Sequence, residues 1–309
     1  MIPALALAAA VASLALAGPP AQRPPGPKEL QELLEAIAAE APRLTPGTEV
    51  AIAVQKLPGG PFAAVNGDVP HVSASSAKLL WTVAALEQVP LSKVAPPAEK
   101  VFRTSDNEAA GEIIDLVGAE AVNAYFSRLG LRHTALTSWG SGGRRRKPQN
   151  SPDEMDGDNY FTAADAVSFL ARLARGELLP AEKTAEVRTW LRWTPRQGCG
   201  GWLTARLPAE VRPRVEHKAG WLPPGCCSDD AAYNTLTEIG LVPLPDGTEY
   251  AVAILARRCR DWRRQERYAE RASCELYRSL AGRPALDCED SPAAPELLPD
   301  GGAPPPDCE

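Results

Sequence analysis

The 309-residue sequence predicts an α+β fold, in which an antiparallel sheet built from both ends of the chain is flanked by terminal helices and receives an α-helical domain in the middle. Two observations predict this arrangement. Apolar and polar residues alternate near both ends, as in half-buried strands, whereas the apolar spacing over about residues 75–192 is that of helices. Hydrophobic residues make up 44% of the chain, which is enough to form a substantial core.

A helix and a pair of strands are expected at the start of the domain. Over residues 28–41 the apolar positions recur at helical spacing, at Leu30, Leu33, Leu34 and Ile37. Residues 48–56 then alternate as a strand does, and a Pro-Gly-Gly turn connects them to a partner strand at 62–65.

The middle of the chain carries signals for helix ends. Gly130 is a C-terminal stop for a helix at 121–129. Thr162 and Asp165 form a variant capping box, which opens a helix that continues at least to Leu173. Several short helices are therefore expected in this region.

Strands return after Arg212, and a last helix follows them. The expected strands are residues 214–219, 235–242 and 250–256, with Asp246-Gly247 as a hairpin turn between the last two. Asp261 is the expected N-cap of a final helix that ends near Leu280.

The N-terminal end of the chain is typical of export. Residues 1–18 contain a small-apolar run that ends Ala-Leu-Ala before Gly18, which is the pattern of a secretory signal peptide and is short for a membrane span. The alternatives are an uncleaved anchor and a misassigned start codon. We expect a secreted or periplasmic protein with no stable membrane span once the signal is removed, and a proline-rich linker at 19–27 leading to the domain at 28–283.

The C-terminal tail, residues 284–309, is rich in proline and acidic. The net charge of the chain is −6, and because the tail carries seven acids and no base beyond Pro284, the rest is nearly neutral. A general nucleic-acid binder would show a basic excess, so nucleic acid is not expected as a partner. The histidines, His71, His133 and His217, show no metal-ligand spacing, and we expect neither a metal nor a cofactor.

All seven cysteines lie at or after Cys199, and none is part of a Cys-x-x-Cys pair. In an exported protein, disulfides are the natural use of cysteine, and we predict at least two. Cys199 lies before one predicted strand and Cys226-Cys227 after it, so a bridge there is expected. Cys259 and Cys274 are a further candidate pair, and the odd count leaves at least one thiol outside such bridges.

Three short motifs carry candidate chemistry. The first is Ser75-Ser76-Ala77-Lys78 at the start of an apolar helix, where positions i and i+3 share a face and place the lysine amine beside the serine hydroxyl. A serine hydroxyl becomes a nucleophile when a base takes its proton, and a buried lysine can have its pKa lowered enough to act as that base. The second is Ser105-Asp106-Asn107 before a helix, and the third is Lys218-Ala219-Gly220 at the end of a strand.

The order of these motifs resembles the class A β-lactamase and penicillin-binding protein superfamily, over roughly residues 28–282. The resemblance implies a β-lactamase/transpeptidase-like fold and a serine acyl-enzyme. It implies Ser75 as the acylated nucleophile, Lys78 as its base or proton relay and Ser105 as the donor of a proton to the leaving nitrogen. Lys218 would support Ser105 and attract a substrate carboxylate.

The resemblance also implies a substrate-binding set. Asn107 would hold Lys78 and the substrate amide, and the strand residues Ala219, Gly220 and Trp221 would line the substrate. The backbone N–H groups of Ser75 and Trp221 would form the oxyanion hole.

The sequence departs from the family in three places. Ala219 stands where the family has Thr or Ser, so a hydroxyl that helps to bind a carboxylate is missing. Only 30 positions separate Ser75 from Ser105, which indicates a shortened helical domain. No Glu-x-x-x-Asn sequence of the deacylating loop occurs between Ser105 and Thr162, and Glu154, then Asp153, are the candidate substitutes.

Three functions are compatible with this sequence. The first is an exported serine hydrolase that acts through an acyl-enzyme on β-lactams or a related amide or ester, with slow deacylation. The second is a D-alanyl carboxypeptidase or transpeptidase with the same chemistry on peptidoglycan. The third is a non-catalytic cell-wall-binding module on the same fold, which Ala219 and the missing loop acid favour.

Overall fold

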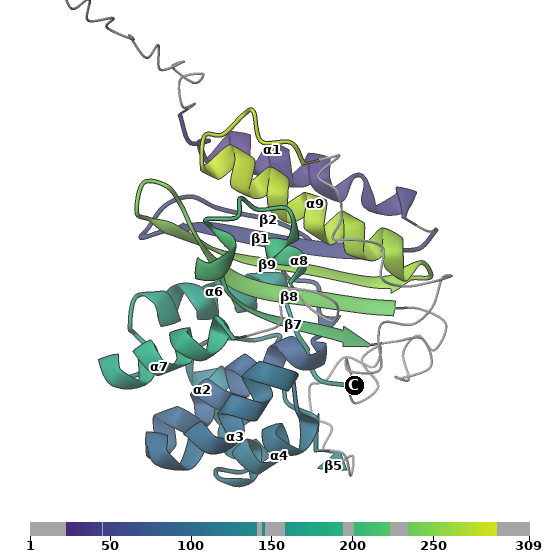
Figure 1. The fold of residues 1–309 in the computed structure, drawn as a ribbon. Helices are drawn as coiled ribbons and strands as arrows, with labels where there is room; N and C mark the ends of the chain where they lie inside the picture. The colour runs from purple at the N-terminus through teal and green to yellow at the C-terminus, as the bar shows by residue number, and fades with distance from the viewer. Residues whose placement is uncertain are drawn as a thin grey trace, which may run out of the picture.

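The computed structural model describes residues 23–44, 46–140, 144–145, 158–193, 201–222 and 234–288, and its elements form three layers. A central sheet has two long helices on one face and a helical domain on the other, as Figure 1 shows. The predicted α+β architecture is confirmed, with strands from both ends of the chain around a helical insertion.

The central sheet has five antiparallel strands in the order β2-β1-β9-β8-β7. Their bounds are β1 Glu49–Leu57, β2 Phe62–Val65, β7 Glu216–Leu222, β8 Asn234–Pro243 and β9 Glu249–Cys259. Each predicted strand is present, and the later three are longer than predicted. β7 forms one edge of the sheet, next to the helical domain.

One face of the sheet is covered by α1 (Pro27–Ala38) and α9 (Trp262–Leu280), with the short α8 (Trp202–Ala205) beside them. The core on this side contains Leu30, Leu34, Ile52, Ile254 and Tyr277, all fully buried. Asp261 caps α9 as predicted, because its Oδ1 accepts a hydrogen bond of 3.0 Å from the Arg264 N–H.

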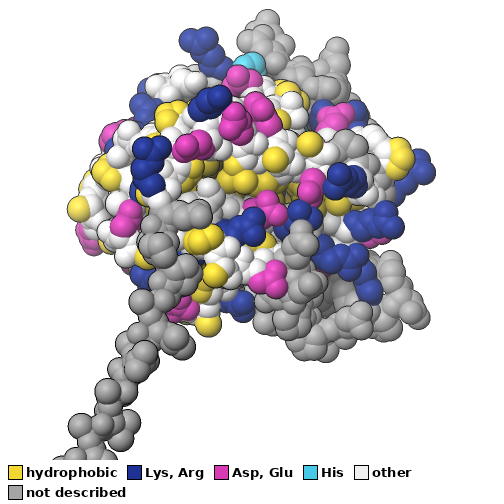
Figure 2. Space-filling view, turned by 90° about the horizontal axis from the view of Figure 1, so that it is seen from above, with side chains coloured by type: hydrophobic (Ala, Val, Ile, Leu, Met, Phe, Trp, Pro, Cys, Tyr) yellow, Lys and Arg dark blue, Asp and Glu magenta, His cyan; other side chains and the backbone are white. Residues whose placement is uncertain are grey.

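The outer surface of these helices carries charges of both signs. Figure 2 views this face and shows basic and acidic side chains interspersed with hydrophobic ones. Arg271 of α9 forms ion pairs with Glu40, which follows the end of α1, at 3.0 Å and with Glu275 of its own helix at 2.9 Å.

The other face is covered by the predicted helical domain. Its helices are α2 Lys78–Gln88, α3 Leu91–Thr104, α4 Asn107–Asp115, α5 Ala119–Arg128, α6 Ala163–Ala174 and α7 Ala181–Leu191. The core on this side includes the stacked rings of Phe102 and Trp190, whose centroids are 5.9 Å apart. Thr162 caps α6, accepting a 3.1 Å hydrogen bond from the Asp165 N–H.

Four short strands of two residues each were not predicted: β3 His71–Val72, β4 Ser138–Trp139, β5 Arg144–Arg145 and β6 Tyr160–Phe161. They form two small sheets, β3 with β6 and β4 with β5. A two-residue strand is too short to show an alternating pattern in the sequence.

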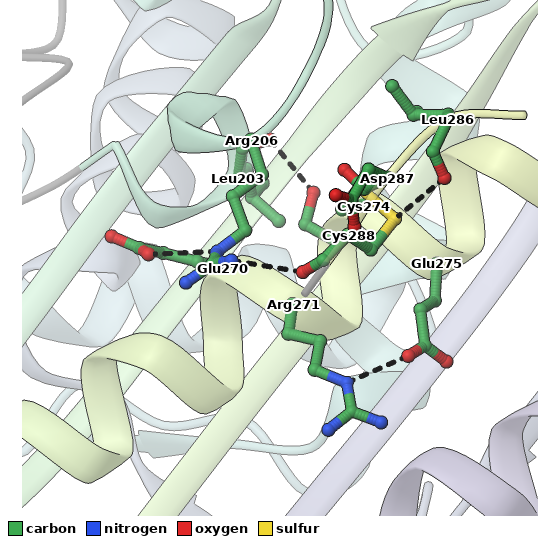
Figure 3. Close-up of a disulfide and its surroundings, with 10 residues drawn as sticks. Leu203, Arg206, Glu270, Arg271, Cys274, Glu275, Leu286, Asp287 and Cys288 are labelled. Carbon is green, nitrogen blue, oxygen red and sulfur yellow. Dashed lines mark hydrogen bonds and ion pairs between the residues drawn. A yellow bond between two sulfur atoms is a disulfide. The ribbon is translucent and has the colours of Figure 1, made fainter. Parts of the chain in front are cut away.

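The cysteine prediction needs a correction. Cys274 of α9 forms a disulfide with Cys288 and not with Cys259, because the chain folds back after α9 and brings Cys288 beside the helix (Figure 3). Cys259 is buried at the end of β9, with its sulfur 3.2 Å from the carbonyl oxygen of Asp261. The expected bridge from Cys199 to Cys226 or Cys227 lies outside the described residues.

The expected signal peptide at 1–18 also lies outside the described residues. Among the helices of the described ranges, none combines the length and the apolar character that a membrane span requires.

Candidate active site

The candidate nucleophile lies on a tight turn between the sheet and the helical domain. The 3₁₀ helix η2 (Ala74–Ala77) contains Ser75 and leads directly into α2, so that Ser75 is half-buried at a helix start. Ala74 before it has φ +46°, a conformation that few residues with a side chain adopt. The backbone is therefore turned sharply at the position before Ser75.

Three buried oxygen atoms fasten this turn to the sheet. The Ser73 carbonyl oxygen accepts hydrogen bonds from Ser76 Oγ at 2.6 Å and from Thr237 Oγ1 of β8 at 2.8 Å. The two hydroxyls are also 2.8 Å from each other. Because all these groups are shielded from water, the hydrogen bonds hold the residues on both sides of Ser75 in one position.

Strand β7 passes so close to this turn that only glycine fits at position 220. A Cβ atom there would lie 2.5 Å from the Ser75 nitrogen and 2.6 Å from the Ser76 nitrogen. The strand and the start of the helix are thus in direct backbone contact, which brings the N–H of Ser75 to the edge of β7.

Ser105 lies opposite, between two lysine side chains. It ends α3 with φ +61°, and Lys78 donates hydrogen bonds to its carbonyl oxygen and, at 3.3 Å, to its Oγ. Lys218 of β7 donates to the same Oγ at 3.1 Å. The three sequence motifs therefore meet at one hydroxyl group.

Asn107, at the start of α4, completes the contacts of Lys78 by accepting a hydrogen bond of 2.6 Å at its Oδ1. Asp106 before it caps α4, with its Oδ1 2.8 Å from the Ala109 N–H. Within the described residues Lys78 makes no hydrogen bond with the Ser75 hydroxyl, so the expected pairing of these two side chains on one helix face is not seen as a direct bond.

Both lysines are buried, at 3% exposure for Lys78 and 2% for Lys218. Burial lowers the pKa of Lys78 well below its usual range, and the charge of Lys218 lowers it further, while Asp106 acts in the opposite direction. Burial also lowers the pKa of Lys218, to about 7, against the charge of Glu238. A neutral amine at Lys78 can accept a proton, and an ammonium at Lys218 can donate to Ser105.

Two further residues of β7, Ala219 and Trp221, have side chains that point away from Ser105. Ala219 is buried in the core beneath α1 and α9, on the opposite face of β7 from Lys218 and Gly220. The half-buried ring of Trp221 packs edge-on against Trp262, at 4.8 Å between ring centroids.

The candidate loop acids Glu154 and Asp153 lie outside the described residues. The end of this loop is described. There Asn159 joins two neighbouring segments by hydrogen bonds, a role that the sequence analysis missed. Its Oδ1 accepts from the N–H groups of Thr137 at 2.7 Å and Ser138 at 3.0 Å, and its carbonyl oxygen accepts from the Ser73 N–H at 2.7 Å. The only sequence signal was an asparagine one position beyond the spacing of the family's loop motif.

The sequence analysis also missed Thr237 and Glu238 of β8. Both side chains are fully buried and bonded, Thr237 to the turn that carries Ser75 and Glu238 to His217 at 2.6 Å. A Thr-Glu pair inside an otherwise apolar predicted strand was the available signal, because buried polar residues need partners.

Solved structures show the same fold. PBP-A is 22% identical, with 83% of this chain and 98% of that chain covered and a TM-score of 0.64. A β-lactamase from Chitinophaga pinensis is 18% identical, with 80% and 98% covered and a TM-score of 0.66. The TLA-3 extended-spectrum β-lactamase is 17% identical, with 83% and 100% covered and a TM-score of 0.67.

No curated protein matches the chain. A family model described as the beta-lactamase enzyme family matches residues 93–280, which is more than half of the chain. The match includes Ser105, Asn107 and Lys218 and begins after Ser75 and Lys78. The predicted resemblance is confirmed, and the chain belongs to the beta-lactamase enzyme family.

Proposed function

We propose that the protein is an exported serine hydrolase that forms an acyl-enzyme on Ser75 with β-lactams or a related amide or ester. The observation that carries the proposal is the Ser105 hydroxyl, which receives hydrogen bonds from the two buried amines of Lys78 and Lys218 beside the turn that holds Ser75. A binding module has no need of two lysines kept out of water in this way.

The proposed reaction begins at Ser75. Neutral Lys78 takes the hydroxyl proton, Ser75 Oγ bonds to the carbonyl carbon, and the carbonyl oxygen becomes an oxyanion held by the N–H groups of Ser75 and Trp221. The bond to the leaving nitrogen then breaks as Ser105 donates its proton to that nitrogen. Lys78 returns a proton to Ser105 along their hydrogen bond, so that the amine is neutral again.

Release of the acyl group needs a different base, because water must be activated near the ester. The family's glutamate motif is absent, and Glu154 or Asp153 would have to replace it. We therefore propose slow deacylation. A mutant of PBP-A, a relative in fold only, is known as an acyl-enzyme complex with penicillin G.

Labelling with a fluorescent penicillin, followed by intact-mass spectrometry, tests the acyl-enzyme. We expect one adduct per chain in the wild type, none in Ser75→Ala, and an unchanged adduct in Ser127→Ala, which removes an exposed hydroxyl of α5. Equal labelling of Ser75→Ala, or no labelling of the wild type, contradicts the proposal.

A D-alanyl carboxypeptidase or transpeptidase is the second candidate, since the same residues would perform the same acyl transfer on peptidoglycan. The family's hydroxyl that would bind a substrate carboxylate is absent at Ala219, but the side chain at this position is buried in the core, so it does not decide between the two. Release of D-alanine from a peptide ending in D-Ala-D-Ala, compared with β-lactam hydrolysis by the same preparation, separates the two. A protein that binds peptidoglycan but does neither would be the wall-binding module.

A further inference from the structure

The end of strand β7 is in contact with a group of three tryptophan rings. Trp221, on the α9 face of the sheet, lies edge-on to Trp262, the first residue of α9, with 4.8 Å between ring centroids and 62° between ring planes. Trp262 in turn lies edge-on to Trp202, the first residue of α8, at 5.5 Å and 75°. Edge-to-face ring pairs at such separations attract each other beyond the effect of burial alone. Trp262 is therefore the central ring and connects the strand to two helices.

The position of Trp262 is fixed by hydrogen bonds at the start of α9. Asp261, the residue before it, caps the helix. Gln265, which is fully buried, donates from Nε2 to the carbonyl oxygen of Ala256 in β9 at 3.0 Å. Glu266 accepts a hydrogen bond of 3.1 Å from Nε1 of Trp202, so that α8 is fastened to the same turn of α9. Trp262 itself is only 7% exposed, and its ring is a fixed surface for Trp221 to pack against.

The side chain of Trp221 is attached through its ring. Its indole Nε1 is buried, and no acceptor for this N–H is present among the residues that the structure describes. A buried donor without a partner costs free energy, so this group does not hold the side chain in place. The edge-on contact with Trp262 does so, and its removal should release the end of β7 on this face.

The neighbours of Trp221 are held on the other face of the sheet, because successive side chains of a strand alternate between the two faces. Leu222 packs against a small buried cluster that includes Val72 of β3. Gly220 approaches the Ser75 nitrogen so closely that a Cβ atom would not fit. The backbone around Trp221 is thus packed on the side of the helical domain by its neighbours and on the α9 side by its own ring.

We propose that Trp262 is a positioning residue of the candidate active site, whose ring holds the end of β7 and with it the backbone N–H of Trp221. The proposal rests on the proposed acyl transfer, because that reaction uses this N–H as an oxyanion donor. Such donors are effective because they are held in place before the reaction begins. A misplacement of about 1 Å, even one caused far from the reacting atoms, can lower a rate by roughly 10²-fold.

The first test is Trp262→Leu, which removes both ring contacts and keeps an apolar side chain in the core. We expect the acylation rate constant at saturating β-lactam, measured by stopped-flow, to fall by up to about 10²-fold. The concentration of β-lactam that gives half of the maximal rate should change little, since the oxyanion develops only in the transition state. Trp262→Phe keeps an aromatic ring at this position and should retain most of the rate.

Phe126→Leu is the matched control, because it removes another buried ring, from α5 in the core of the helical domain. A variant that is only less stable contains less folded protein. This lowers the amplitude of the acylation burst and leaves the rate constant of the folded molecules unchanged. We therefore expect a wild-type rate constant in Phe126→Leu, whatever its amplitude.

The second test measures the end of β7 without a substrate. Hydrogen exchange followed by mass spectrometry reports how often the backbone hydrogen bonds of a segment open. In Trp262→Leu the peptide that covers residues 216–222 should exchange faster than in the wild type, whereas a peptide from β1 should not. In Phe126→Leu the peptide that covers residues 216–222 should exchange as in the wild type.

The outcomes separate this proposal from the proposed function. Faster exchange at residues 216–222 in Trp262→Leu, with no acylation of any variant or of the wild type, supports the anchoring of β7 by Trp262 and contradicts the proposed function. A wild type that is acylated, with the same rate constant in Trp262→Leu, overturns the role of Trp262. Should Trp262→Leu fail to fold, Trp221→Leu breaks the same ring contact from the half-buried side. An unchanged acylation rate constant in that variant overturns it equally.

Discussion

Gly220 illustrates how much of the site depends on a single residue. Because a Cβ there would lie 2.5 Å from the Ser75 nitrogen, Gly220→Ala must push β7 away from the turn. The N–H of Ser75 would then no longer align with the strand, and loss of one oxyanion donor typically lowers a rate by roughly 10²–10³-fold. We expect a decrease of that size in the rate of acylation, measured by stopped-flow fluorescence.

Gly26→Ala is the matched control for this substitution. Its added Cβ would meet no atom closer than Glu29 Oε2 at 3.5 Å, so we expect wild-type acylation. Thermal unfolding of both variants shows whether the loss is local. An acylation rate in Gly220→Ala within a factor of about two of the wild type would mean that the close approach of β7 has no catalytic role.

Turnover is the second prediction at the residue scale. Because the loop motif that supplies the deacylating glutamate is absent, we expect a stoichiometric burst with a chromogenic cephalosporin, followed by weak steady-state hydrolysis. General-base assistance is typically worth about 10²–10⁴-fold in rate, which sets the scale of the deficit. If Glu154 or Asp153 substitutes for the missing acid, Glu154→Gln or Asp153→Asn should slow the steady state further. Sustained turnover without a burst, unchanged in both variants, would show that water is activated elsewhere.

The residues of the site differ in how far the sequence could predict them. Ser75, Lys78 and Ser105 lie within short motifs whose spacing is visible, and the structure brings Lys78 and Lys218 to the same hydroxyl. Thr237 and Glu238 could not be placed in this way. Their contacts with Ser73 and His217 depend on the register of β8 against β7, which the sequence of either strand alone does not determine.

At the scale of elements, the two edge strands of the central sheet, β2 and β7, are covered in different ways. Gln31 of α1 covers the outer edge at β2, donating to the Ala64 carbonyl oxygen at 3.1 Å and accepting from the Ala64 N–H at 3.2 Å. The side chain thus takes the place of a neighbouring strand and blocks further pairing. At the opposite edge, β7 meets the turn that carries Ser75, so this edge is used by the candidate site.

The disulfide of α9 gives the prediction at this scale. Cys274 and Cys288 are 14 residues apart, and Arg206 binds the Cys288 carbonyl oxygen at 3.0 Å and Glu270 at 3.2 Å, as Figure 3 shows. In the chain-entropy account, a bridge closing a loop of about 15 residues stabilises a fold by about 3 kcal/mol. We expect Cys274→Ser with Cys288→Ser to lower the free energy of unfolding by about that amount. Urea unfolding measures it, and an unchanged midpoint would contradict the expectation.

Peptide mapping without reduction tests the cysteine prediction as a whole. The prediction of at least two disulfides requires a second bridge, and Cys199 with Cys226 or Cys227 remains the predicted pair. A map with seven free thiols would contradict both the disulfides and the export that they presuppose. The sequence placed Cys199 before β7 and Cys226-Cys227 after it along the chain. It did not show that the chain turns back after α9, because no periodic pattern marks residues 281–288.

At the scale of the whole molecule, the candidate site lies where the sheet and the helical domain meet. Ser75, Lys78 and Ser105 come from the helical domain, whereas Lys218 and Gly220 come from the sheet. The sequence predicted both parts because apolar residues recur at different spacings in strands and in helices. Their relative position is held by contacts between distant residues, and these become visible only in the folded chain.

Glu216 is the clearest of these contacts between the two parts. On β7 it is 2% exposed and accepts hydrogen bonds from Arg188 Nε of α7 at 2.7 Å and from Nη2 of Arg192, the residue after α7, at 2.6 Å. Arg188 also reaches Glu249 of β9 at 2.7 Å. These ion pairs connect α7 of the helical domain to β7 and β9 of the sheet. Glu216 lies two residues before Lys218 in β7.

Glu216→Gln should therefore destabilise the protein, because it leaves two guanidinium groups without their buried carboxylate. We expect a loss of about 1–3 kcal/mol in the free energy of unfolding, largely persisting at high salt because the Glu216 carboxylate is buried. The matched control is Glu87→Gln, since Glu87 pairs with Arg128 on the surface, where the two side chains are 37% and 54% exposed. An exposed pair contributes at most about 1 kcal/mol, and salt weakens it. Equal losses for the two variants in urea unfolding, at low and at high salt, would show that Glu216 does not hold the two parts together.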